Sequence, residues 1–140
     1  MSNYFNYRAG LSSVGQYQMS GIPFVTASFT VPTHAALGVG ALEFEFPQVT
    51  RFFTIINTNT GANSPLRVGF SALGTTGSEG GGTDNYFTLD NGESYTGEFK
   101  VARVYLLGPS AETSASVIAG LTGIQTGSLQ ENWSGSAGVG

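Results

Sequence analysis

The feature that most limits how this chain can fold is a series of short apolar runs separated by turn residues. The runs are rich in β-branched and aromatic side chains, and several of them stop at a proline or next to glycine and asparagine. Runs of this length and composition predict β-strands. They lie at residues 24–31, 42–46, 49–56, 66–71, 86–89, 94–99, 101–107 and 116–122.

The pattern within the runs predicts which side chains face a core. In residues 42–46 (LEFEF) the leucine and the phenylalanines fall on one face of a strand, and Glu43 and Glu45 fall on the other. Residues 49–56 form the most apolar run, so we expect a strand that is buried on both faces, and residues 101–107 form a second apolar strand.

The segments between the runs predict turns and loops. Residues 57–65 (NTNTGANSP) have turn chemistry throughout. Residues 74–84 contain five glycines and no large apolar residue, which favours an exposed loop. The Asn-Gly pair in residues 90–93 predicts a tight hairpin between its two flanking strands. Residues 116–122 have the length of a short helix, but their β-branched residues and glycines favour a strand.

Eight short strands at near-regular spacing, with no convincing amphipathic helix, indicate an all-β fold. We expect an antiparallel β-sandwich or jelly roll of two packed sheets. The predicted organisation is an extended N-terminal arm at residues 1–20, a β-sandwich domain at 21–125, and a Gly/Ser-rich C-terminal tail at 126–140.

The two ends of the chain carry aromatic residues that no predicted strand explains. Polar residues interrupt every apolar stretch of the arm, which argues against a secretory leader, and its glycines argue against a helix. Extended, the arm reaches roughly 60–70 Å. We predict that it lies on another subunit, although it can also fold back as an edge strand of its own sandwich. The expected partner-interface anchors are Tyr4, Phe5, Tyr7, Tyr17 and Trp133.

Composition limits the partners and the chemistry. The chain has no cysteine, and its five basic and nine acidic residues give a formal net charge of −4. Nucleic-acid binding depends on clustered Lys and Arg, so we expect none. No apolar run approaches the roughly 18 residues of a membrane span. Charged residues make up only 10% of the chain, which favours a surface that is mostly covered by other protein.

The candidate catalytic and metal-binding residues are weak. His34 is the single histidine and has no serine or acid at a telling spacing. Glu43 and Glu45 share a strand face, for which the simpler interpretation is a solvent face. The acidic loops lack the spacing of a calcium loop. We therefore expect no catalytic residue, no metal site and no cofactor.

The aromatic arm, the Asn/Thr/Gly-rich loops, the segment NYFTLDNGESYTGEFKVARVYLL and the later SASVIAGLTGI resemble the small virion structural proteins of tailed bacteriophages, in particular capsid decoration (cement) proteins. The resemblance implies a non-enzymatic jelly-roll-like domain on the outside of a capsid, often trimeric, that clamps the major capsid protein. It also implies that the protein is made in the host cytoplasm and ends up in the virion.

Two other functions are compatible with the same strands. A glycan-binding module would stack sugars on exposed aromatic rings, for which Tyr86, Tyr95 and Tyr105 are candidates. A small glycan hydrolase would use Glu43 or Glu45.

Overall fold

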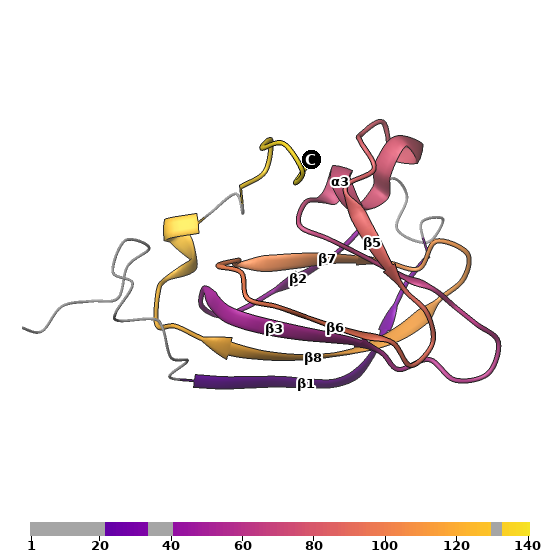
Figure 1. Cartoon of the computed structure of the whole chain (residues 1–140), viewed down its shortest axis with the longest axis horizontal. Helices are drawn as coiled ribbons and strands as arrows, with labels where there is room; N and C mark the ends of the chain where they lie inside the picture. The colour runs from indigo at the N-terminus through magenta and orange to yellow at the C-terminus, as the bar shows by residue number, and fades with distance from the viewer. Residues whose placement is uncertain (1–21, 34–40, 130–132) are drawn as a thin grey trace, which may run out of the picture.

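The eight predicted runs form eight β-strands. The computed structural model describes residues 22–33, 41–129 and 133–140, and its strands make two four-stranded antiparallel sheets (Figure 1). The strands are β1 (Ile22–Val31), β2 (Leu42–Glu45), β3 (Thr50–Asn57), β4 (Leu66–Gly69), β5 (Tyr86–Leu89), β6 (Ser94–Gly97), β7 (Arg103–Leu107) and β8 (Thr113–Leu121). The described helical segments are short: α3 (Ala72–Thr76), η1 (Gly77–Gly80) and η2 (Thr126–Leu129).

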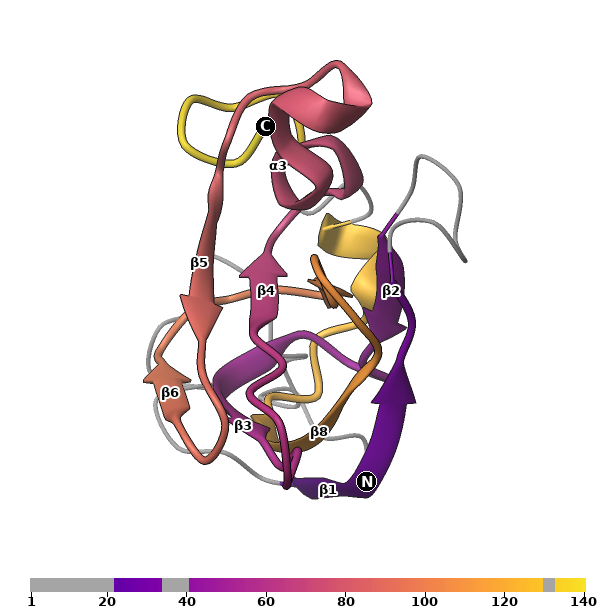
Figure 2. The same cartoon turned by 90° about the vertical axis from the view of Figure 1, so that its right-hand side faces the viewer.

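The strands pair in a nested order. One sheet has the order β1-β8-β3-β6 and the other has the order β2-β7-β4-β5. The chain therefore pairs β4 with β5, β3 with β6, β2 with β7 and β1 with β8. Figure 2 shows β4 beside β5 and β3 beside β6. The prediction of an antiparallel β-sandwich is confirmed, and residues 116–122 lie in a strand and not in a helix, except for Thr122 at its end.

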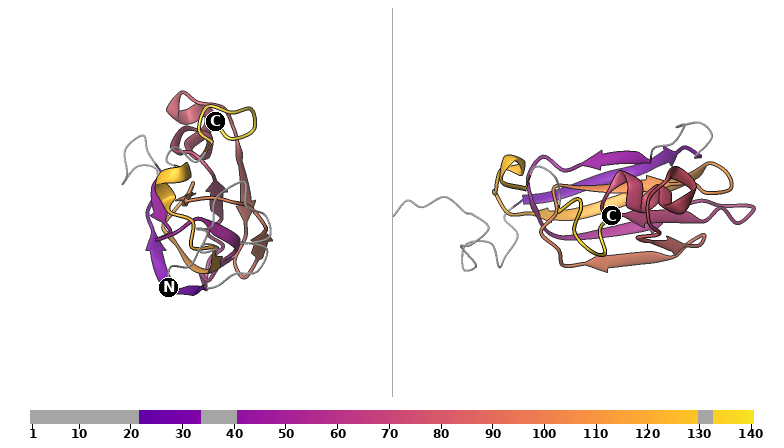
Figure 3. Two further views of the ribbon diagram at one scale, coloured as in Figure 1. Left: turned by 90° about the vertical axis from the view of Figure 1, so that its left-hand side faces the viewer. Right: turned by 90° about the horizontal axis from the view of Figure 1, so that it is seen from above.

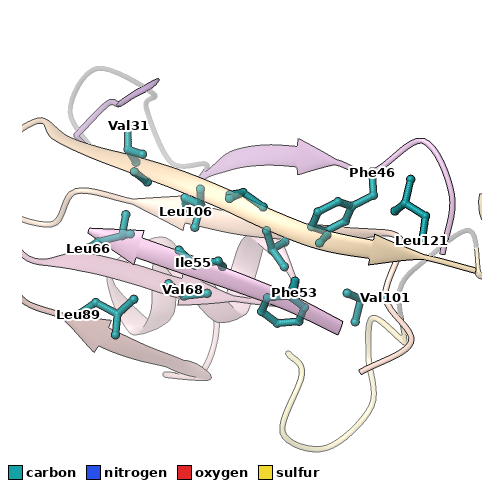
Figure 4. Packing of buried hydrophobic residues seen from close by; sticks show 14 residues of the cluster. Val31, Phe46, Phe53, Ile55, Leu66, Val68, Leu89, Val101, Leu106 and Leu121 are labelled. Atoms are coloured by element: carbon teal, nitrogen blue, oxygen red, sulfur yellow. The ribbon is translucent and has the colours of Figure 1, made fainter. Parts of the chain in front are cut away.

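A single core fills the space between the two sheets. Its fourteen buried residues come from both sheets and include Phe53 and Ile55 of β3 and Leu106 of β7, all with 0% exposure (Figure 4). Leu66 and Val68 of β4 face inward, as the alternation predicts. The core is apolar because each strand turns one set of alternate side chains to the opposite sheet.

The expectation that β3 is buried on both faces is wrong. Phe53, Ile55 and Asn57 are buried, whereas Phe52 and Ile56 at outward positions are only half-buried. β3 lies between β8 and β6, so its backbone is paired on both edges, but the second sheet covers only one of its faces. Its apolar outward side chains therefore lie at the surface of the described structure.

The prediction of a hairpin at residues 90–93 is also wrong. β5 and β6 belong to different sheets, so the turn between them carries the chain from one layer to the other. The amide of Glu93 donates to the carbonyl oxygen of Asp90 at 2.9 Å, and Gly92 has a φ of 80°. Asn91 has no positive φ. A hairpin turn of type I′ needs positive φ at both central residues, whereas a type II turn needs it only at the second. The positive φ at Gly92 alone therefore fits a type II turn and not a type I′ hairpin turn.

Only the later part of residues 74–84 is the exposed loop that their glycines predict: Ser78, Gly81, Thr83 and Asp84 are exposed, whereas the first part is buried. Gly74, Thr75 and Thr76 lie in α3 and are buried. Ser71 caps the helix by accepting a hydrogen bond from the Gly74 amide at 2.9 Å. The helix packs on the outer side of the β2-β7-β4-β5 sheet, where Gly69 has no Cβ and so leaves room for the Thr75 side chain (Figures 1 and 3).

Candidate functional site

Of the five predicted interface anchors, the structure describes one. Tyr4, Phe5, Tyr7 and Tyr17 lie outside the described residues. Trp133 lies in the C-terminal segment 133–140, and 51% of it is exposed. Among the described residues it is thus one of the most exposed large apolar side chains, as an interface anchor must be in the free protein.

The C-terminal segment folds back onto the sandwich, which gives Trp133 a place to pack that no predicted strand supplied. The indole nitrogen of Trp133 donates to the carbonyl oxygen of Lys100 at 3.4 Å, between β6 and β7. The Ser136 amide donates to the Trp133 carbonyl at 3.1 Å, and the Val139 amide donates to the Ser136 carbonyl at 3.0 Å. Two consecutive turns therefore close the segment on itself.

The end of this segment is held against α3. The hydroxyl of Ser71 donates to the carbonyl oxygen of Val139 at 2.7 Å while it also caps the helix. A Cβ atom on Gly74 would overlap the same carbonyl, so glycine is required for this approach. The C-terminal segment and α3 accordingly lie side by side on one face of the molecule (Figures 1 and 3).

An apolar pocket opens between this segment and the end of the sandwich. We call it the Trp133 pocket; its volume is about 340 Å³. Phe99, 44% exposed, forms one wall and packs edge-on against Phe70, with 5.6 Å between ring centroids. The pocket is lined by Phe70, Phe99, Lys100, Val101, Trp133 and residues 137–139. Its size and lining suit an apolar side chain or a small apolar ligand.

A second surface that the sequence analysis missed is the outward face of the β1-β8-β3-β6 sheet, which we call the neutral face. Of the residues in its four strands, only Arg51 is charged, and it pairs with Glu98 at the margin at 2.9 Å. Serine and threonine side chains, such as Thr54 and Thr96, surround an apolar centre. That centre is made by Pro23, Val25, Phe52, Ile56 and Ile118.

The signal for this face was present in the sequence. Residues 22–33 and 113–130 contain no charged side chain at all, although both segments include outward positions of strands. A surface strand normally carries polar or charged residues on its outer side. Uncharged outward positions on two neighbouring strands therefore indicate a surface that is not simply solvated.

The opposite outer face, on the β2-β7-β4-β5 sheet, is charged. The guanidinium of Arg103 pairs with the Glu43 carboxylate at 3.1 Å. Arg67 is 9% exposed, donates to the carbonyl oxygen of Thr76 at 3.1 Å and lies 4.2 Å above the centre of the Tyr86 ring. Burial, and then the nearby Glu43 carboxylate, raise the pKa of Tyr105 on this face above its usual 10.0. We call this surface the charged face.

The residues proposed for sugar binding are not brought together. Tyr86 and Tyr105 both flank Gly69 on the charged face, where Thr75 of α3 lies over Gly69. Tyr95 belongs to the other sheet and packs against Phe87, with ring centroids 4.7 Å apart. A continuous platform of the three rings is therefore absent from the described structure.

Two further candidates from the sequence are the single histidine and a metal site. His34 lies outside the part of the chain that the structure describes. No group of three or more histidine, cysteine or acidic residues within it is placed to hold a metal ion. No helix in the described ranges is long and apolar enough to cross a membrane.

Comparison with known proteins leaves the family open. No family model, no curated protein and no solved structure matches the chain. The Trp133 pocket and the two outer faces are the surface features of the described residues that can indicate a function.

Proposed function

We propose that this protein is a non-enzymatic virion structural protein, and specifically a decoration protein that stabilises a phage capsid through subunit contacts. The observation that carries the proposal is the Trp133 pocket. It presents two exposed aromatic side chains, Trp133 and Phe99, around an apolar hollow at one end of the sandwich. Tryptophan in such a setting is the side chain that most often dominates a protein interface.

The position of the pocket suits a receptor for a protein side chain. Its walls come from the core edge on one side and from the closed C-terminal segment on the other, so both are held before a partner arrives. A preformed pocket loses little conformational entropy on binding. We propose that its occupant is an apolar side chain of the major capsid protein.

The strand order supports the same class of protein. Pairing of the first strand with the last, the second with the seventh, and so on inward is the connectivity of a jelly roll, and we propose that fold here. Jelly rolls are common in capsid proteins, although lectins share them. A formal net charge of −4 favours a place on the outside of the shell, away from packaged nucleic acid.

The arm completes the proposed attachment. Tyr4, Phe5, Tyr7 and Tyr17 would dock on neighbouring subunits, where burial of their rings stabilises the contact. In this arrangement the sandwich is the rigid domain, and the aromatic residues at the two ends of the chain make the binding contacts. The finished protein is then part of the virion after synthesis in the host cytoplasm.

The test is sedimentation of the protein with capsids of the virus that encodes it. We expect stoichiometric binding by the wild type and a loss of about thirtyfold or more in affinity for Trp133→Ala. Leu73→Ala is the control, because Leu73 is 53% exposed but lies in α3, outside the pocket lining. If both variants bind as the wild type does, the pocket is not the attachment site.

A second variant tests the arm without shortening the chain. Replacing Tyr4, Phe5, Tyr7 and Tyr17 together by serine should abolish capsid binding and leave the melting temperature of the sandwich unchanged. Binding of a glycan array that depends on Trp133, with no capsid binding, would instead support the glycan-binding alternative.

A further inference from the structure

We propose that the neutral face is the contact between two copies of this chain, packed sheet against sheet across a two-fold axis. The proposal deepens the proposed function, because it names a second copy as the partner of one face and leaves the Trp133 pocket for the capsid. It rests on the exposed apolar centre of the face, on the near absence of charged side chains from its strands, and on the interrupted edge strand β1.

The centre of the face is exposed and apolar. Val25 of β1 pairs across the strands with Ile118 of β8, and their exposed fractions are 69% and 38%. Phe52 and Ile56 of β3 lie on the same side, on either side of Thr54. Side chains of this kind gathered on one face of a sheet mark a surface that is covered in the working assembly.

The charge of the chain decides what covers it. Two copies with a formal net charge of −4 each repel one another at long range, and a two-fold contact uses the same patch on both copies. A patch with almost no charged side chains adds no like-charge contact and buries no charge. The neutral face meets this condition, because its one charged strand residue, Arg51, is already paired with Glu98.

The charged face has no net charge in its strands either, but a contact there would have to bury charged side chains. It carries Glu43, Glu45, Arg67 and Arg103 in its strands, and α3 already covers part of it. A three-fold ring needs two different patches that fit each other, whereas a two-fold contact uses one patch twice. Since the described sheets offer one neutral apolar patch, they favour a dimer over the trimer that the bacteriophage resemblance implies.

The edge strand argues for contact through the face and against contact through the edge. β1 is the outermost strand of its sheet, and an open edge can pair with the edge of another copy. Pro23 cannot donate a backbone hydrogen bond, and a register shift between Thr26 and Phe29 interrupts the strand. Both features interrupt continuous pairing along this edge.

The area fits a dimer that dissociates on dilution. The three longer strands of the neutral face have eight to ten residues. With about 3.3 Å per residue and about 4.8 Å between strands, the four strands give the neutral face an area of roughly 500 Å² on each copy. The total of roughly 1,000 Å² is near the lower limit for a specific interface.

The experiment measures the mass of the full chain by sedimentation over a range of concentrations. We expect the wild type to pass from dimer to monomer on dilution. Val25→Lys and Val25→Glu should each weaken association about tenfold or more, because either charge would be buried at the contact. Thr88→Lys and Thr88→Glu are the matched controls, since Thr88 is exposed on β5, the edge strand of the other sheet.

The two signs of charge separate a local contact from long-range repulsion. Long-range repulsion alone would make lysine favour association and glutamate oppose it, in both positions. Val25→Thr keeps the branched shape and should weaken association by a smaller factor. A wild type that is monomeric throughout, a trimeric mass, or equal effects at positions 25 and 88 would each overturn the proposal.

The result is independent of the capsid experiment. A monomeric protein that still binds capsids through Trp133 would contradict the dimer alone. A dimer broken by changes at Val25 that binds no capsid would contradict the proposed decoration function and leave the dimer in place.

Discussion

The two outer faces of the sandwich differ in what covers them. On the charged face, α3 packs over β4 and β7, and the Arg67 guanidinium connects the sheet to the Thr76 carbonyl and to the Tyr86 ring. On the neutral face, Val25 and Ile118 are exposed, and no helix of the described chain lies over them. Both faces belong to sheets of four strands that share one core.

This difference separates a surface that stabilises the folded chain from a surface that is available for association. On the charged face, Arg67 and the Arg103–Glu43 pair make their contacts within the chain, so that face contributes to folding without a second molecule. The neutral face leaves apolar area in water, and covering it gains free energy only on association. We therefore expect substitutions on the charged face to change unfolding and substitutions on the neutral face to change assembly.

The largest loss of stability is expected from a change in the core that lies between the two sheets. Phe53→Ala should lower the free energy of unfolding by about 3–5 kcal/mol, because Phe53 is fully buried and its loss leaves a cavity. Phe52→Ala, one residue away on the neutral face, should cost about 1 kcal/mol or less in the monomer, since its ring is only half-buried.

Chemical denaturation of dilute protein measures both values. If Phe52→Ala proves as destabilising as Phe53→Ala, then the neutral face supports the monomer directly and the contrast between the faces is lost. If Phe52→Ala weakens dimerisation, measured by sedimentation, and Phe53→Ala does not, the contrast between the faces becomes sharper.

A smaller effect separates the two faces through their arginines. Arg67→Ala should lower the free energy of unfolding by about 2–4 kcal/mol, because it removes a buried charged hydrogen bond and the contact with Tyr86. Arg51→Ala should cost about 1 kcal/mol or less, because its pair with Glu98 is exposed. Equal losses for the two variants, measured by urea denaturation, would show that α3 does not stabilise the charged face.

The strands were predictable from sequence because their periodicity reflects the core directly. Leu66 and Val68 alternate with Arg67, and the structure buries the first two in the core. The same reasoning could not see that Arg67 is also buried, since its cover comes from α3, in a segment whose glycines predicted a loop. Two threonines, Thr75 and Thr76, hold that helix by donating to carbonyls four residues earlier.

The candidate site was less predictable because its parts meet only in the folded chain. Trp133 was found from its type and its polar surroundings, but Phe99 and Val101 were assigned to strands and not to a pocket. Asn57 shows the same limit: in sequence it begins a turn, and in the structure its buried amide donates to the carbonyls of Ser64 and Leu89, at 2.9 Å each. Contacts between residues so far apart in sequence depend on the order of strands in the sheets.

The smallest predicted effect is a change in alkaline stability that belongs to the charged face. Burial and then the Glu43 carboxylate raise the pKa of Tyr105, so the folded protein keeps the phenolic proton at a pH where the unfolded chain releases it. The stabilisation from this group is complete below about pH 10 and is lost as the pH rises through the raised pKa. Tyr105→Phe should therefore lose less stability above about pH 10 than the wild type. The difference should be small, because Tyr105 is only half-buried and solvent screens its charge. Urea denaturation at a series of alkaline pH values measures it, and identical profiles for wild type and Tyr105→Phe would mean that Tyr105 does not couple the charged face to pH.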